Sequence, residues 1–429
     1  MSATLIPPIE APERVIDSAP PPPPASRHAT RERLTSLDVF RGLTVAGMLL
    51  VNDPGTWSAI YPPLEHAEWN GWTPTDLIFP FFLFIVGITT QLSINARRAR
   101  GDDESAITRQ IIRRGALIFL FGFLVNGFPF VAWGSVAGNP DPSLWARFID
   151  RLLHWRVMGV LQRIGVAYLI SALIATRVRV RTQVIIIASL LFAYWFIMTV
   201  LPVPGSNGTP GLLLLGNGAT TWQGYIDRLL LDWSRFGLGN HLWVSSQTWD
   251  PEGILSTSGA VCTALLGNLA GRWIAQPKTL YERLAGLSAG GALAMMFGLM
   301  WHWSFPINKS LWTGSYVLFT GGLAAVSLAT VMWLVDAQQW RWWTKPWIIY
   351  GMNPMVAFVG SGVLARLIYS IIKVNYNGRS IALQSAIYQS AFASWLAPKN
   401  ASLAFALCFV GFWFLVLAFL HRRNIVLRV

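Results

Sequence analysis

The sequence predicts an all-α polytopic transmembrane helix bundle of about ten helices. Of its 429 residues, 53% are hydrophobic and 12% are charged, whereas ordinary soluble domains carry roughly 25% charged residues. The 22 Trp residues agree with this class, because indole rings collect at the two bilayer interfaces. Long apolar stretches separated by polar loops complete the case, since about 20 apolar residues cross a bilayer as a helix.

Ten apolar stretches define the predicted spans. Most are long enough to cross a hydrocarbon core of ~30 Å, although the first and the third are short. They are 37–52, 75–95, 111–127, 157–176, 183–201, 254–274, 283–303, 311–335, 346–371 and 401–420. The segment 380–397 is predicted to form either an amphipathic interfacial helix or part of a re-entrant loop.

Residues 1–33 are expected to form a disordered, Pro-rich cytoplasmic tail, and residues 34–429 the membrane domain. The tail contains the run Pro20–Pro24 and shows no hydrophobic periodicity, so it cannot bury enough apolar surface to fold. It has no apolar h-region, and a cleaved signal peptide is therefore not expected.

The basic residues predict the orientation. Of the 33 Lys and Arg residues, 21 lie on the side of the N-terminal tail, nine lie on the opposite side, and Arg41, Arg163 and Arg366 lie within spans. Because positively charged loops stay in the cytoplasm, both chain ends are predicted to be cytoplasmic. The net charge of +13 then follows from topology, and no nucleic-acid partner is expected.

Several classes of chemistry have no sequence support. The two Cys residues both fall in apolar runs, which argues against a disulfide framework and a Cys-based metal site. The sequence contains no Walker motif, no dinucleotide fingerprint and no metal-ligand cluster. An ATP-driven pump and a metal enzyme are therefore not expected.

His66 is the main candidate for chemistry. It lies in the short loop between the first two predicted spans, where Trp69 and Trp72 would exclude water and nearby acids would orient the ring. A histidine titrates near pH 6.5, roughly, and can take a proton from an amine or attack an acyl group. The alternative is a surface histidine in a polar loop.

Asp76 opens the second predicted span, where two roles are open to it. Thr73 fits a helix N-cap, Pro74 the first helical position and Asp76 the third. An acid at this position also complements the helix dipole. Capping is predicted as the main role, and orienting His66 is compatible with it.

Arg163 lies within the fourth predicted span, where an arginine costs on the order of 2.5–3.5 kcal/mol on insertion scales. It is therefore expected to face the bundle interior with an anionic partner. Two hypotheses stay open: a structural ion pair with a residue such as Asp38, and a site for an anion or a phosphate.

Two far-side loops and one helix break add further candidates. Asp250 and Glu252 precede the sixth span and Lys309 precedes the eighth. Acids at helix starts are often only caps, and a snorkelling side chain equally explains Lys309. Asn353 precedes Pro354 in a break of the ninth span, and irregular backbone at membrane depth is tolerated where it lines a cavity.

Five sequence blocks, taken together and in this order, resemble the heparan-alpha-glucosaminide N-acetyltransferase family and its bacterial NagX-type relatives. The resemblance extends from about residue 34 to residue 429. The blocks are VFRGLTVAGMLLVN…HAEWNGWTPTDLIFPFFLFIVG, RVMGVLQRIGVAY, TWDPEGILST, PINKSLWTGSYVL and GMNPMVAFVG.

The resemblance implies acetyl transfer across a membrane. Cytoplasmic acetyl-CoA would donate the acetyl group, and the amine of a glucosamine-type sugar or cell-wall fragment on the periplasmic side would accept it. The family's active-site histidine matches His66, and an asparagine implicated in the same chemistry matches Asn52. Whether the histidine carries the acetyl group or acts as a general base stays open. A homodimer in a bacterial inner membrane is also expected.

The other predicted site residues follow from the chemistry of the two substrates. Acetyl-CoA is polyanionic, so Arg163 and Arg41 are expected to contact its phosphates, with Asn353 at the helix break as a further contact. Asn52 is expected to donate a hydrogen bond to the developing oxyanion. The acceptor is expected to meet Asp76, Asp250, Glu252 and Lys309.

The main alternative is a transporter of N-acetylglucosamine or a related amino sugar. Ten helices, an intramembrane arginine and a broken helix would serve transport equally well. However, the chain lacks the matched hydrophobic halves that many transporters show. A non-catalytic scaffold is a third hypothesis, and it leaves Arg163 costly and unexplained.

Overall fold

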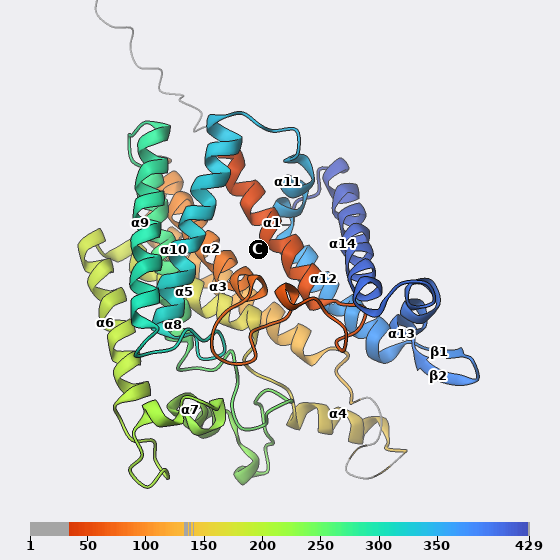
Figure 1. Ribbon diagram of the computed structural model, residues 1–429. Helices are drawn as coiled ribbons and strands as arrows, with labels where there is room; N and C mark the ends of the chain where they lie inside the picture. Colours follow the sequence, from red (N-terminus) through yellow and green to blue (C-terminus); the bar gives the residue numbers. More distant parts are fainter. Residues whose placement is uncertain (1–33, 133–135, 137–138, 140, 428–429) are drawn as a thin grey trace, which may run out of the picture. The chain divides into compact units, whose positions relative to one another are not determined.

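The computed structural model describes residues 34–132, 136, 139 and 141–427, and the chain from Thr35 onward forms one compact unit. The predicted tail, residues 1–33, lies outside the described residues, so its disorder stays a prediction. Apart from one β-hairpin and isolated bridges, the regular structure in the described ranges is helical, which confirms the all-α class (Figure 1).

Each of the ten predicted stretches contains a bundle helix, and two helices share the ninth. The bundle helices are α1 (Thr35–Asn52), α2 (Pro74–Ala99), α3 (Glu104–Gly127), α5 (Val160–Arg177), α6 (Val180–Thr199), α8 (Thr257–Ile274), α9 (Leu280–Trp301), α10 (Gly314–Met332), α11 (Lys345–Met352), α12 (Pro354–Arg366) and α14 (Pro398–Arg422). Shorter elements are α4 (Leu144–Leu153), α7 (Trp222–Leu231), α13 (Leu383–Tyr388), β1 (Lys373–Tyr376) and β2 (Arg379–Ala382).

Eight of the described helices are long and apolar enough to cross a membrane. The two predicted spans outside this group are α1 and α8, each 18 residues long. Most residues of both helices are buried within the protein, so polar and small side chains replace the apolar surface that lipid would require. The total of ten spans stays a prediction.

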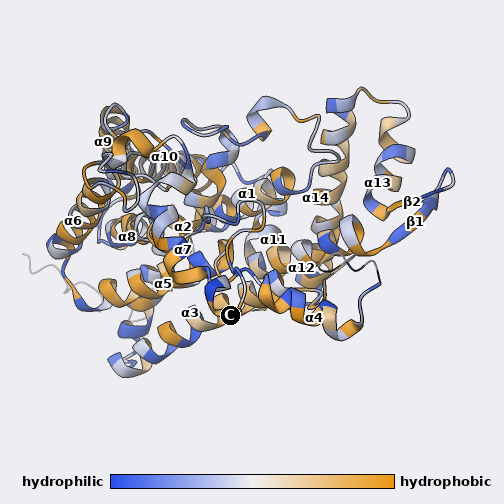
Figure 2. Cartoon of the chain, turned by 90° about the horizontal axis from the view of Figure 1, so that it is seen from below, coloured by the Kyte–Doolittle hydropathy of each residue, from blue (hydrophilic) through white to orange (hydrophobic). Residues whose placement is uncertain are grey.

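The loops contain elements that the sequence analysis did not predict. The segment 380–397 begins in the antiparallel hairpin of β1 and β2, where Val374 pairs with Ile381, and continues into α13. Figure 2 shows the outer part of this hairpin as hydrophilic, in contrast to the apolar long helices. Helices α4 and α7 fold in the loops 128–156 and 202–253, for which no element was predicted.

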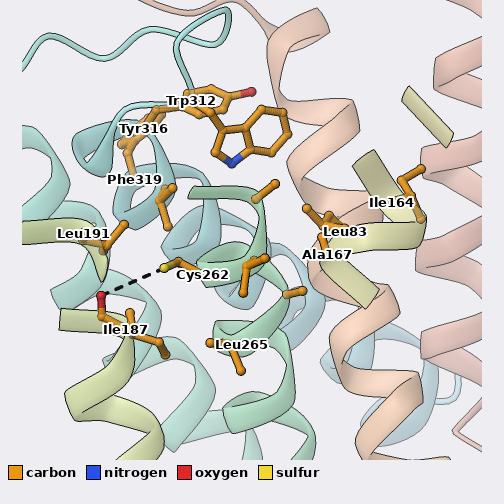
Figure 3. Close-up of a cluster of buried hydrophobic side chains, with 14 of the residues drawn as sticks. Leu83, Ile164, Ala167, Ile187, Leu191, Cys262, Leu265, Trp312, Tyr316 and Phe319 are labelled. Atoms are coloured by element: carbon orange, nitrogen blue, oxygen red, sulfur yellow. Dashed lines mark hydrogen bonds between the residues drawn. The ribbon is translucent and has the colours of Figure 1, made fainter. Parts of the chain in front are cut away.

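A large cluster of buried apolar side chains lies where α2, α5, α6, α8 and α10 meet (Figure 3). Its members include Leu83, Ile164, Leu191, Cys262 and Tyr316. The outward surfaces of α9 and α14 are also apolar, with exposed side chains such as those of Leu293, Phe297, Leu415 and Phe419. An apolar exterior of this kind suits contact with lipid.

Small residues bring α2 and α8 into close contact. A Cβ atom on Gly87 would lie 2.1 Å from the carbonyl oxygen of Ala264, and one on Gly267 would lie 2.1 Å from that of Phe84. Glycine at such positions lets two membrane helices approach backbone to backbone. The contact fixes α2, whose first turn carries Asp76.

Successive apolar stretches run in opposite directions, which brings several helix ends together. One end of the bundle, the loop end, contains the C-terminal ends of α1, α3 and α12 and the N-terminal ends of α2, α5, α8 and α10, with α4 and α7 beside them (lower part of Figure 1). Most candidate site residues belong to this end, although sequence distances of more than 200 residues separate some of them.

Candidate functional site

His66 and Asp76 form a hydrogen-bonded pair at the loop end. The Nδ1 atom of His66 lies 2.7 Å from Oδ1 of Asp76. The Asp76 side chain is 1% exposed and that of His66 is 47% exposed. An ionised carboxylate accepts the proton on Nδ1, so a neutral ring carries its free lone pair on Nε2. The pair thus presents a base at an accessible position.

Asp76 uses its second carboxylate oxygen to hold the backbone. Oδ2 accepts hydrogen bonds from the backbone N–H groups of Ala67 and Thr73, each at 3.0 Å. Thr73 and Asp76 form a capping box at the start of α2, with Pro74 in the first helical position. The capping prediction is confirmed, and the His66 contact exists in addition. One buried carboxylate therefore anchors the helix start, the loop and the imidazole.

Lys309 brings a positive charge to this pair. Its Nζ atom lies 3.1 Å from Nδ1 and 3.2 Å from Nε2 of His66, and 3.6 Å from Oδ1 of Asp76. If Nζ lay in the plane of the imidazole at these nearly equal distances from both nitrogens, it would collide with Cε1, the carbon between them. The Lys309 ammonium therefore lies over the face of the ring.

The charge state of Lys309 reflects its surroundings. Burial lowers the pKa of the Lys309 ammonium, and the carboxylates of Asp76 and Glu252 offset this effect only in part. The pKa of Lys309 therefore lies below its ordinary value. Such a lysine gives up a proton more readily than a solvated one.

Asn308 positions Lys309 against the His66 loop. Its Nδ2 atom donates to the carbonyl oxygen of Trp69 at 2.9 Å and to Oδ1 of Asn70 at 3.2 Å, and its Oδ1 accepts from the N–H of Leu311 at 2.8 Å. These bonds join the connection between α9 and α10 to the loop before α2. The Lys309–His66 contact is therefore a product of tertiary structure.

Arg156 joins the two acids that precede α8, and sequence reasoning missed it. Its Nε atom donates to Oδ2 of Asp250 at 2.8 Å, and its Nη2 atom donates to Oδ1 of Asp250 at 2.5 Å and to Oε2 of Glu252. Burial alone would raise the pKa of Glu252, but the charges of Arg156 and Arg163 outweigh it and lower that pKa. The sequence feature that could have indicated Arg156 is its position at the start of the fourth predicted span, in the same block as Arg163.

Arg163 is fully buried behind these acids. Its Nη2 atom donates to Oγ of Ser256 at 2.5 Å, and its guanidinium lies 5.1 Å from the ring centroid of Trp312. The ion pair suggested with Asp38 is wrong, because Asp38 instead pairs with Arg41 at 2.6 Å. Arg163 thus meets a hydroxyl and an aromatic face in the structure.

A cavity of about 190 Å³ adjoins the His66–Asp76 pair. Its polar lining consists of Asn52, His66, Thr75, Glu252 and Lys309. Its apolar lining comes from α1, α2, α5 and α12 and includes Met48, Phe82 and Met355. Met355 lies in the first turn of α12, which begins away from the loop end. The cavity therefore extends from His66 into the apolar interior of the bundle.

Two predicted site residues lie outside this cavity. Arg41 donates from Nε to the carbonyl oxygen of Gly351 at 2.6 Å, in addition to its pairing with Asp38. The Asn353 side chain donates to the carbonyl oxygen of Ile425 at 3.0 Å and accepts from the N–H of Leu427 at 2.9 Å, so it tethers the C-terminal segment. The structure unites Asn52, His66, Asp76, Glu252 and Lys309, places Asp250 and Arg163 behind Glu252, and separates Arg41 and Asn353 from them.

The fold and this site define a multi-pass membrane protein that presents a carboxylate-oriented histidine beside a cavity, an arrangement suited to proton or group transfer. Residues 33–224 match the family model described as heparan-alpha-glucosaminide N-acetyltransferase, catalytic. The chain is 29% identical over 388 residues to the heparan-alpha-glucosaminide N-acetyltransferase of Mus musculus and 30% identical over 373 residues to that of Homo sapiens. The chain is therefore similar to heparan-alpha-glucosaminide N-acetyltransferases over most of its length.

These alignments cover 80% and 77% of the chain but 55% and 53% of the mouse and human proteins. The chain thus spans about half the length of the curated relatives it matches. The family resemblance seen in the sequence blocks is confirmed, and the assignment to the bacterial NagX-type members stays a prediction.

Proposed function

We propose that this protein transfers an acetyl group from cytoplasmic acetyl-CoA to the amine of a glucosamine-type sugar on the periplasmic side of the membrane. The observation that carries the proposal is the 2.7 Å pair of His66 and Asp76 beside a cavity that Asn52 also lines. Acetyl transfer needs a base for the amine and a hydrogen-bond donor for the oxyanion. The mouse and human relatives bear the name of an N-acetyltransferase of this kind.

The proposed chemistry assigns a role to each group. Nε2 of His66 takes a proton from the neutral acceptor amine as its nitrogen attacks the thioester carbon. Asp76 holds the proton on Nδ1 and stabilises the imidazolium that forms. The Asn52 amide donates to the oxyanion while the new C–N bond forms. The C–S bond then breaks, and the imidazolium returns its proton to the leaving thiolate, which yields CoA and the N-acetylated sugar.

The shape of the cavity supports the direction of transfer. Its apolar lining from α1, α2, α5 and α12 suits the thioester end of an acyl-CoA arm approaching from the interior of the bundle. Its polar lining surrounds the point where an acceptor would arrive. Glu252 and Lys309 are proposed to contact the part of the acceptor that reaches His66, whereas Asp76 acts through His66 and Asp250 through Arg156 because both carboxylates are buried.

The decisive experiment reconstitutes purified protein in liposomes, with radiolabelled acetyl-CoA on one face and glucosamine on the other. His66→Ala is expected to lower kcat by roughly 10²–10⁴-fold, the usual contribution of a general base. The matched control is His154→Ala, because His154 is about half exposed and contacts Asp150 away from the cavity. His154→Ala is expected to retain wild-type turnover.

Different results would lead to different conclusions. Turnover by His66→Ala close to the wild-type rate would remove His66 from the mechanism. No product from the wild type, despite acetyl-CoA binding, would exclude glucosamine as acceptor. Neither product nor acetyl-CoA binding, together with uptake of labelled N-acetylglucosamine, would establish the transporter alternative. Labelled protein after incubation with acetyl-CoA alone would reveal an acetylated His66.

The acetyl-CoA contacts are tested by binding. Arg41→Gln is expected to weaken acetyl-CoA affinity by about tenfold, because a hydrogen bond between charged groups contributes roughly 1.5–3 kcal/mol. Arg100→Gln is the control, since Arg100 is an exposed arginine in the loop between α2 and α3. Unchanged affinity in Arg41→Gln, measured by calorimetry in detergent, would exclude Arg41 from the donor site.

The same measurement separates the two hypotheses for Arg163. Lost acetyl-CoA affinity at an unchanged melting temperature would support a phosphate site at Arg163. A lower melting temperature with retained affinity would support a structural role, which its contacts with Ser256 and Trp312 favour. Asn353→Ala removes the side-chain hydrogen bonds to the C-terminal segment. Its acetyl-CoA affinity and its melting temperature are measured in the same way.

The membrane location and the oligomeric state of the protein are also part of the proposal. We place the protein in a bacterial inner membrane as a homodimer, on the basis of the sequence resemblance and the charge distribution of its loops. Light scattering of the detergent-solubilised protein measures the oligomeric state, and a monomeric mass would contradict the dimer. Labelling of cysteines introduced into the loops would establish which face meets the cytoplasm.

A further inference from the structure

A second cavity, of about 310 Å³, lies beside the His66 cavity. The two cavities share the lining residues Met48, Asn52, Val160, Leu161 and Phe358. Its volume falls within the range of ligand pockets, which is roughly 300–1,000 Å³. A molecule in this second cavity would therefore adjoin the first one across Asn52, the residue proposed to stabilise the oxyanion.

The second cavity is lined by polar groups whose partners the fold does not supply. The Asp53 carboxylate is buried and forms no hydrogen bond or ion pair with any described residue. Nη1 of Arg366 and Nε2 of Gln162 are buried and have no hydrogen-bond partner within the described ranges. Buried polar groups are nearly always satisfied, because leaving one unpaired costs about 1–3 kcal/mol. Three such groups around one cavity indicate a ligand.

The charges in this cavity restrict the ligand. Arg156 also lines the cavity, but it is already paired with Asp250 and Glu252. One carboxylate, that of Asp53, and one guanidinium, that of Arg366, are therefore left for a ligand. Burial raises the pKa of Asp53 to about 7, and a cation beside it would keep this carboxylate ionised.

We infer that the second cavity binds the acceptor, and that the acceptor is an amino sugar bearing a carboxylate or phosphate, with its ammonium at Asp53 and its anionic group at Arg366. A neutral sugar would leave the Arg366 guanidinium without an anion. The phosphates of acetyl-CoA would be repelled by Asp53. The Gln162 amide donates to the anionic group or to a ring hydroxyl. The ammonium gives one proton to the Asp53 carboxylate, and the neutral amine that results lies next to Asn52 and the shared wall, where it can attack an acetyl group in the first cavity.

This inference rests on the proposed acetyl transfer but is tested by binding, which requires no turnover. Purified protein without acetyl-CoA is titrated with glucosamine and with glucosamine 6-phosphate. The wild type is expected to bind the phosphate at least about tenfold more tightly, as a charge-assisted arginine contact predicts. Arg366→Gln is expected to abolish this preference, and Arg366→Lys to retain part of it because the charge is kept.

Matched controls define the outcomes. Arg379→Gln, at an exposed arginine of β2, is expected to bind both sugars as the wild type does. Acetyl-CoA affinity is expected to be unchanged in Arg366→Gln, which also shows that the variant is folded. A fall in acetyl-CoA affinity instead would assign the cavity to the donor's phosphates and overturn the inference. Equal affinity of the wild type for both sugars, or binding of neither, would also overturn it.

The two proposals fail in different ways. Preferential binding of glucosamine 6-phosphate without acetylation in the liposome assay would contradict the proposed reaction and leave the site intact. Acetylation of glucosamine without any preference for the phosphorylated sugar would contradict the site and leave the reaction intact.

Discussion

Asp76→Asn is expected to lower kcat by about 10⁴-fold, the loss seen when the buried aspartate of a serine protease triad is replaced by asparagine. The physical reason lies in the bonds of the two carboxylate oxygens. Oδ2 accepts hydrogen bonds from the backbone N–H groups of Ala67 and Thr73. An asparagine must place its own oxygen there, so its NH₂ group faces Nδ1 of His66. The ring then accepts at Nδ1 and carries its proton on Nε2, where the proposed base is needed.

A second capping box provides the control for Asp76→Asn. Glu282 occupies the equivalent position at the start of α9, where it accepts the N–H of Thr279 at 2.8 Å, and none of the histidines that the structure describes contacts it. Glu282→Gln should have little effect on kcat. Because asparagine keeps the cap, the melting temperature of Asp76→Asn should stay close to that of the wild type. A kcat within tenfold of the wild-type value would show that the carboxylate does not set the tautomer of His66.

Arg156→Met is expected to lower the folding stability by about 3–5 kcal/mol, the usual loss when one partner of a buried ion pair is removed. The substitution leaves the carboxylates of Asp250 and Glu252 without their cation, and these side chains are 0% and 13% exposed. The measurement is thermal or denaturant unfolding in detergent. Since both acids precede α8, loss of the pair should also disturb the cavity that Glu252 lines.

Two comparisons identify the cause of that loss. Arg156→Met combined with Asp250→Asn and Glu252→Gln removes the unpaired charges, so much of the stability should return. Arg228→Met is the single-site control, because Arg228 donates to the backbone carbonyls of Ala219 and Thr248 and pairs with no carboxylate among the described residues. A similar loss in Arg228→Met would attribute the effect to packing and not to buried charge.

The class of the fold could be predicted from the sequence because lipid imposes a local rule. A membrane helix must satisfy its backbone internally and present an apolar stretch of set length, so each predicted stretch contains a helix. The sequence also placed Asp76 among the acids near His66, because both residues belong to one short stretch around the same loop. The capping pattern of Thr73, Pro74 and Asp76 is equally local, and the structure confirms it.

Contacts between distant segments could not be predicted in this way. Lys309 reaches His66 through the bonds of Asn308 to Trp69 and Asn70, and Arg156 reaches Asp250 across the start of α8. Each of these pairs depends on which helix ends the alternating bundle gathers at the loop end. For the same reason, sequence reasoning paired Arg163 with Asp38, whereas the fold places Arg41 beside Asp38.

The sequence by itself determined the membrane class, the approximate helix positions and the helix cap at Asp76, because apolar length and helix-start chemistry act over a few residues. Only the tertiary structure decided which charges meet around the cavity and which are left for a ligand. A charge buried at one helix end is neutralised by whichever segment packs there, and that packing depends on side-chain fit along whole helices such as α2 and α8. Asp53 and Arg366 became candidates only because the described part of the fold offers neither the Asp53 carboxylate nor Nη1 of Arg366 a partner.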